Sequence, residues 1–138
     1  INIKEGDIFE NILLRNTMIP RDFMMTKEQY HEAGCFDTSV PIYEDWDLKL
    51  RLAHKNKFYF TGSNGIAYRR HGEGLSSANN KTHLKWLSYI FQKNKSLIAV
   101  GKQKHMEKMF NDYLLSTFNV SLAYNVMQKI KVFMRKVF

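Results

Sequence analysis

Apolar residues recur at helical spacing in several stretches of the first 62 residues. Residues 7–16 (DIFENILLRN) carry apolar side chains about one turn apart behind Asp7, which predicts a short helix with Asp7 as its N-cap. Thr26 and Gln29 have the spacing of a capping box, in which each residue's side chain bonds the other's backbone N–H. Residues 27–33 are therefore predicted as a second helix.

A glycine and an acidic turn mark the next boundaries. Gly34 follows the second helix at the place where a left-handed residue commonly ends a helix. Residues 44–55 (EDWDLKLRLAHK) are rich in Leu and Lys, which are good helix formers. Three acids in the first turn complement the positive end of the helix dipole. This stretch is predicted as a third helix.

Three shorter runs have the composition of strands. Residues 22–26 (DFMMT) follow Pro20 and are predicted as a short strand. Residues 57–62 (KFYFTG) and 65–71 (GIAYRRH) are aromatic or β-branched and flank a turn rich in Gly and Asn, which predicts two strands or a hairpin.

From residue 81 onward the periodicity is helical throughout. Three amphipathic helices are predicted, with breaks at Gly101 and near Asn119. Their apolar stripes are Leu84, Leu87, Ile90 and Phe91; then Met106, Met109, Phe110, Tyr113 and Leu114; then Val126, Ile130, Phe133 and Val137.

The length of the chain and the distribution of its charges indicate two regions. The 138 residues, 44% of them hydrophobic, suffice for one domain with a core. The formal charge is +8, yet residues 1–80 hold ten basic against eleven acidic side chains, while residues 81–138 hold eleven against two. We therefore expect a first region of mixed chemistry, residues 1–80, and a basic helical extension, residues 81–138.

Several classes of protein are excluded or disfavoured. Cys35 is the only cysteine, so the chain forms no internal disulfide and no thiolate metal cage; we expect it to be a small buried residue and the compartment to be cytoplasmic. No apolar run approaches the ~20 residues of a transmembrane helix, so we expect no span here. The chain opens at Ile1 without a basic and apolar leader, and we expect it to be an excerpt of a longer protein.

The acids at the start of the third predicted helix allow two interpretations. Glu44, Asp45 and Asp47 are favourable charges at a helix N-terminus, and such turns are common. A carboxylate there can also act as a general base if a substrate proton comes within hydrogen-bond reach. The three side chains alone favour the first interpretation.

Four blocks of residues surround and include these acids, in this order along the chain: Gly34, Phe36 and Asp37; Glu44, Asp45, Trp46, Asp47, Leu48, Leu50, Arg51 and Leu52; Tyr68, Arg69 and His71; and Ser76 or Ser77. Their order resembles the second half of the catalytic domain of family 2 glycosyltransferases, inverting enzymes of the GT-A fold. The resemblance covers about residues 11–77. It implies an α/β fold class: the C-terminal portion of a GT-A, Rossmann-like domain with a few short strands, followed by the all-helical extension.

The resemblance also implies roles for individual residues. Asp45 would be the catalytic base that takes a proton from an acceptor hydroxyl as it attacks the anomeric carbon of a nucleotide-sugar. Glu44 would orient the acceptor or support Asp45, and Asp37 would belong to the substrate-binding set. Trp46 would line the acceptor side or pack beneath the helix. Asp47 is interpreted as a helix-turn or salt-bridge residue.

Donor binding is implied at a later block. Arg69 would lie near the donor diphosphate, which a guanidinium binds bidentately, and His71 would bind substrate or ligate a divalent cation, Mg²⁺ or Mn²⁺. Alternatively, His71 is a histidine hydrogen-bonded at a strand end. The donor half of the family, with its Asp-x-Asp motif, has no counterpart in this chain, so we expect the chain alone to be inactive and the activity to reside in the full-length protein.

The basic extension leaves three roles open: packing on the first region, contact with an anionic membrane surface, or contact with another subunit in a homo-oligomer. Residues 127–138 (MQKIKVFMRKVF) have the composition of an interfacial helix. An enzyme peripheral to the inner face of the membrane would suit a lipid-linked acceptor; a glycan acceptor is the other expectation.

A non-enzymatic basic module that binds anionic membrane or nucleic acid is the rival interpretation. A sequence pI of about 9.6 meets its electrostatic requirement. However, the sequence shows no zinc-finger spacing and no aromatic RNA-binding strand motif. We therefore expect no nucleic-acid partner.

Overall fold

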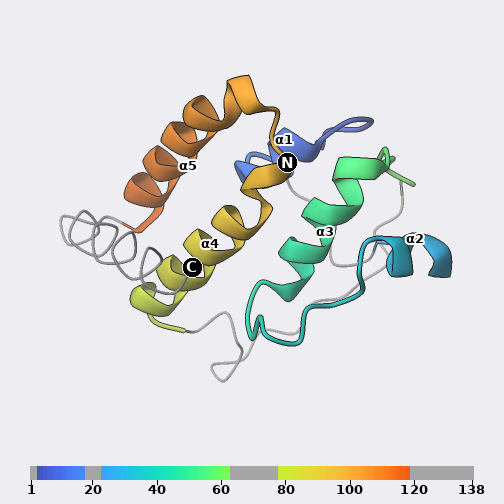
Figure 1. The fold of residues 1–138 in the computed structure, drawn as a ribbon, viewed down its shortest axis with the longest axis horizontal. Helices are drawn as coiled ribbons and strands as arrows, with labels where there is room; N and C mark the ends of the chain where they lie inside the picture. Colours follow the sequence, from blue (N-terminus) through green and yellow to red (C-terminus); the bar gives the residue numbers. More distant parts are fainter. Residues whose placement is uncertain (1–2, 18–22, 63–77, 119–138) are drawn as a thin grey trace.

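A computed structural model describes residues 3–17, 23–62 and 78–118. Within these ranges the chain forms helices α1 (Phe9–Leu13), α2 (Lys27–Glu32), α3 (Glu44–Lys55), α4 (Asn80–Asn94) and α5 (Gln103–Phe118), with the 3-10 turns η2 (Lys95–Leu97) and η3 (Val100–Lys102) between the last two. Figure 1 shows α4 running beside α5 on one side and α3 on the other, while α2 lies beyond α3.

The predicted α/β fold class is wrong for this part of the chain, where a GT-A portion with short strands is replaced by helices and irregular segments. Residues 23–26 form no strand, and residues 57–62 contribute one isolated antiparallel bridge, between Phe58 and Gly6. No sheet occurs in the described ranges. The remaining predicted strand, residues 65–71, falls outside them.

The physical reason is that parts of the molecule other than a neighbouring strand contact each of these two runs. Phe23 and Met25 pack against apolar residues of α3, while Met24 between them is exposed. The backbone N–H of Phe60 donates to the Glu5 side chain at 2.6 Å instead of to a neighbouring strand. β-Propensity reflects fit to a pleated, half-buried surface, and these runs have no such surface to join.

Helix α2 starts at the predicted residue and ends at Glu32, one residue before the predicted end. The Thr26 Oγ1 accepts from the backbone N–H of Gln29 at 3.1 Å, and the Gln29 Oε1 accepts from the backbone N–H of Thr26 at 2.9 Å. Gly34 has φ +83° and lies just past the end of the helix. The capping box and the left-handed glycine thus fix both ends of α2.

Helix α1 is shorter than predicted and Asp7 is not its N-cap. The N-cap position belongs to Ile8, and no side chain caps the helix there. Gly6 just before it exchanges two backbone hydrogen bonds with Phe58, at 2.7 and 2.9 Å. This tie fixes the backbone at Gly6, and α1 begins at Phe9, one residue later than an N-cap at Asp7 would give.

One hydrophobic core joins helices from both sides of residue 80. Phe110 of α5 stacks on Phe91 of α4, with 4.4 Å between ring centroids, and on Trp46 of α3, at 6.0 Å. The fully buried aliphatic members include Leu13, Leu50, Leu87, Ile90 and Leu114. The described part of the basic extension therefore packs on the earlier helices. The third predicted helix, residues 126–137, lies outside the described residues.

Candidate functional site

Helix α3 covers residues 44–55 as predicted and begins at an unusual residue. Tyr43, at the N-cap position, has a left-handed backbone with φ 64° and makes no side-chain cap. Such a conformation is uncommon outside glycine. The Tyr43 hydroxyl is 2.8 Å from Nδ1 of His83 on α4, and the Arg15 guanidinium lies 5.1 Å from its ring centroid. Neighbouring elements therefore hold the residue that directly precedes Glu44 and Asp45.

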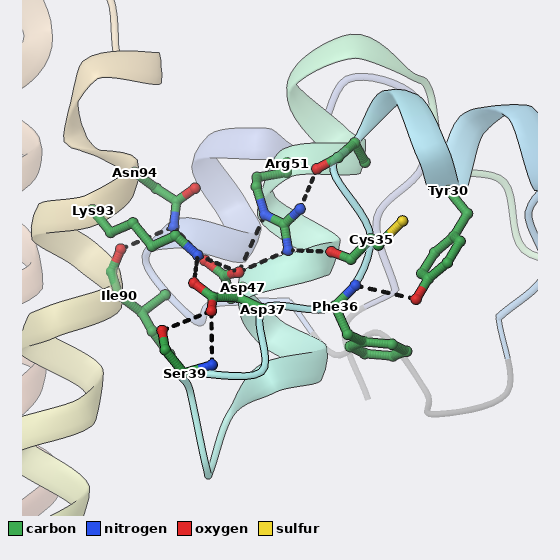
Figure 2. A network of polar contacts seen from close by, with 11 residues as sticks. Tyr30, Cys35, Phe36, Asp37, Ser39, Asp47, Arg51, Ile90, Lys93 and Asn94 are labelled. Carbon is green, nitrogen blue, oxygen red and sulfur yellow. Dashed lines mark hydrogen bonds and ion pairs between the residues drawn. The ribbon is translucent and has the colours of Figure 1, made fainter.

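Asp47 is fully buried and belongs to a network that joins α3 to α4. Its Oδ2 accepts from Arg51 at 2.8 and 3.1 Å and from the Lys93 ammonium at 2.8 Å, while its Oδ1 accepts from the Asn94 amide at 2.9 Å. Figure 2 shows these groups converging from the two helices. A buried carboxylate with both oxygens engaged is a structural ion, which matches the interpretation of Asp47 as a salt-bridge residue.

Asp37 is held by the same lysine. Its Oδ2 lies 2.6 Å from the Lys93 ammonium, and its Oδ1 accepts from the backbone N–H and hydroxyl of Ser39 at 2.8 and 2.6 Å. These bonds, the one to Lys93 first, hold the pKa of Asp37 well below its usual range. Burial works against the charge of Lys93, but its hydrogen bonds to Asp37 and Asp47 raise its pKa overall.

Arg51 ties α3 to the turn after α2. Its guanidinium donates to the backbone carbonyls of Ala33 and, at 2.8 Å, Cys35, in addition to its bonds with Asp47. A Cβ built on Gly34 would lie 3.3 Å from Nη1 of Arg51. The glycine of the first sequence block therefore lies close to the arginine of the second, with little room for a side chain between them.

Asp45 differs from Asp47 in exposure and in partner. Its side chain is 40% exposed and forms an ion pair with Lys49, one turn further along, at 2.9 Å. The Lys49 side chain is only 5% exposed. Glu44 is likewise partly exposed. The first turn of α3 therefore presents two carboxylates to the surface and buries the third.

Trp46 is a core residue. Its indole N–H donates to the backbone carbonyl of Ile12 at 2.9 Å, and its ring is buried against Phe110. Of the two positions expected for it, it occupies the one beneath the helix.

Arg69 and His71 lie outside the described residues, so their expected roles at the donor diphosphate and the cation stay predictions. In the described ranges, no three His, Cys, Asp or Glu side chains gather as a metal site would require. Comparisons with protein-family models, with curated proteins and with solved structures found no match. No helix among the described residues is long and apolar enough to cross a membrane.

Sequence reasoning missed Lys49, Lys93 and Asn94. Lys93 and Asn94 are 46 and 47 residues from their common partner Asp47, so no local spacing could identify them. Two local signals were available: Lys49 lies four residues after Asp45, the spacing of an ion pair on one helical face, and Asn94 is an amide at the end of the apolar stripe of α4.

Proposed function

We propose that this chain supplies the acceptor-side part of an inverting glycosyltransferase and that Asp45 is its general base. The enzyme would transfer a sugar from a nucleotide-sugar to a hydroxyl of a glycan or of a lipid-linked acceptor. Asp45 would remove the proton of that hydroxyl as its oxygen attacks the anomeric carbon.

The observation that carries the proposal is the difference in side-chain exposure among residues in the first turn of α3. Asp47 is 0% exposed and fully engaged, and Trp46 is buried in the core. Asp45, which directly precedes them in the chain, keeps a side chain that is 40% exposed. A general base must approach the proton that it removes, and among these three residues Asp45 meets that requirement.

The residues around Asp45 have supporting roles in this proposal. Glu44 is partly exposed, and its carboxylate can accept hydrogen bonds from acceptor hydroxyls. Asp37 is engaged by Lys93 and Ser39, so we assign it to the loop that borders the site rather than to direct contact with substrate. From the sequence blocks alone, we assign Arg69 and His71 to the donor diphosphate. On the same basis, we expect the full-length enzyme to bind a divalent cation.

The test is Asp45→Asn in the full-length protein that contains this chain. Nucleoside diphosphate release would be measured with a panel of UDP- and GDP-sugars, with Mg²⁺ or Mn²⁺, in the presence of a membrane or glycan extract as acceptor. Loss of general-base catalysis predicts a fall of about 100- to 10,000-fold in kcat. Asp112→Asn, which removes an exposed carboxylate from α5, is the matched control and should retain activity.

Unchanged transfer by Asp45→Asn would rule out Asp45 as the base. The rival interpretation is a non-enzymatic basic module in which the acids only favour the helix. It predicts no transfer by the wild-type full-length protein and a loss of about 1 kcal/mol or less of unfolding free energy in the Asn variant.

A further inference from the structure

We propose that Lys49 is a positioning residue for Asp45, holding its carboxylate in one orientation and in the charged form that a base requires. This inference rests on the function proposed above. The Lys49 ammonium lies 2.9 Å from Oδ2 of Asp45, one helical turn away on the same face of α3.

The burial of Lys49 distinguishes this pair from an ordinary surface ion pair. Exposed pairs contribute little because two long side chains must be ordered in water. The pair of Lys102 with Glu10 is of that kind, with side chains 59% and 46% exposed. The Lys49 side chain is 5% exposed, so the surrounding packing restricts its position as well as the ion pair.

A second contact fixes the ammonium from another segment. Lys49 Nζ lies 5.1 Å from the centroid of the Phe23 ring, at cation–π distance, and that ring packs against the core beside α3. A lysine fixed at its stem and at its charged end is the rigid partner, whereas Asp45 is the more exposed one. We therefore assign Lys49 as the residue that orients the carboxylate of Asp45.

The geometry is compatible with proton abstraction. A carboxylate offers about four lone-pair sites on its two oxygens, so a bond from Lys49 to Oδ2 leaves capacity for a substrate hydroxyl. Two titratable neighbours in the chain precede Asp45: Glu44, in the first turn of α3, and the Tyr43 phenol, which interacts with the charge of Asp45. Burial, and to a lesser degree the charge of Asp45, raise the pKa of Tyr43, so this phenol stays neutral near pH 7.

The test compares Lys49→Met, Lys49→Arg and the control Lys55→Met, which removes a charge from the far end of the same helix. The pH profile of kcat/KM would be recorded for the full-length enzyme. An opposite charge at ion-pair distance favours the charged carboxylate. In Lys49→Met the acid-side limb should therefore move to higher pH by about one unit, the low end of such effects because Asp45 is partly exposed. Lys49→Arg should restore the profile, and Lys55→Met should leave it unchanged.

A second readout needs no enzymatic activity. The carboxyl carbon of Asp45 would be followed by NMR across pH in the 138-residue chain, its signal identified by its absence in Asp45→Asn. Its titration midpoint should rise by about one unit in Lys49→Met. An unchanged midpoint would overturn the inference even if Asp45 is the base, whereas transfer retained by Asp45→Asn would overturn the proposed function instead. Lys49→Gln replaces Lys49→Met if the latter fails to fold by circular dichroism.

Discussion

Lys93 of α4 reaches the buried carboxylate of Asp47 on α3, with 2.8 Å between Nζ and Oδ2, and so joins two segments that are 46 residues apart. The same ammonium lies 2.6 Å from Asp37. One side chain therefore connects the loop after α2, the start of α3 and the end of α4.

Substitution of Asp47 should be strongly destabilising. Asp47→Ala leaves Lys93, Arg51 and the Asn94 amide without their common acceptor, and breaking a buried ion pair typically costs about 3–5 kcal/mol. Lys93→Met should cost less, because Arg51 and Asn94 still bond the carboxylate. Urea unfolding of the two variants checks this order; equal losses would show that Lys93 carries the network.

The stability of the protein should depend on Asp37 in acid. The folded-state pKa of Asp37 is lowered, so its contribution is complete above the unfolded value of about 3.9 and is lost as the pH falls through the folded value. The difference in unfolding free energy between wild type and Asp37→Asn should be constant from pH 7 to pH 5 and should shrink below about pH 4. Denaturant titrations at stepped pH measure it, and a difference that stays constant down to pH 2 would contradict the role of its charge.

Gly34→Ala should destabilise the fold by about 1–3 kcal/mol, because φ +83° is unfavourable for a residue with a Cβ. The new methyl would also press on Arg51, at 3.3 Å. Gly101→Ala is the matched control, since its added Cβ meets nothing within 4 Å. Thermal unfolding should separate the two variants clearly.

The lysines of α4 and α5 should bind anionic lipid. Lys81, Lys85, Lys104 and Lys108 are exposed in the described residues, and basic side chains near an anionic surface contribute about 1 kcal/mol each. We expect sedimentation with phosphatidylserine vesicles that weakens between 50 and 200 mM salt, and neither phosphatidylcholine vesicles nor duplex DNA should bind comparably. Tight DNA binding without vesicle binding would reverse this expectation.

Local signals in the sequence predicted local structure well. The capping box of Thr26 and Gln29, the left-handed Gly34 and the limits of α3 each depend on residues within a few positions of one another. The break between α4 and α5 likewise falls at Gly101, inside η3.

Features that depend on distant partners were not predictable in this way. Residues 23–26 were predicted as part of a strand, but Phe23 and Met25 pack against a cluster that includes Leu48 and Leu52 of α3 instead of joining a sheet. Helical spacing alone did not rank the exposure of Asp45 and Asp47, since both are acids in one helical turn; only the resemblance assigned them different roles. The packing of α4 against α3 buries Asp47 and leaves Asp45 partly exposed.

The core that crosses residue 80 sets a practical limit on how this protein can be shortened. An expression fragment that ends before α4 would uncover the ring of Trp46 and deprive Asp47 of both Lys93 and Asn94. Such a fragment would carry the whole acidic turn yet lack the surroundings that orient it, and we expect it to aggregate. Fragments designed for crystallisation should therefore extend at least through Phe118.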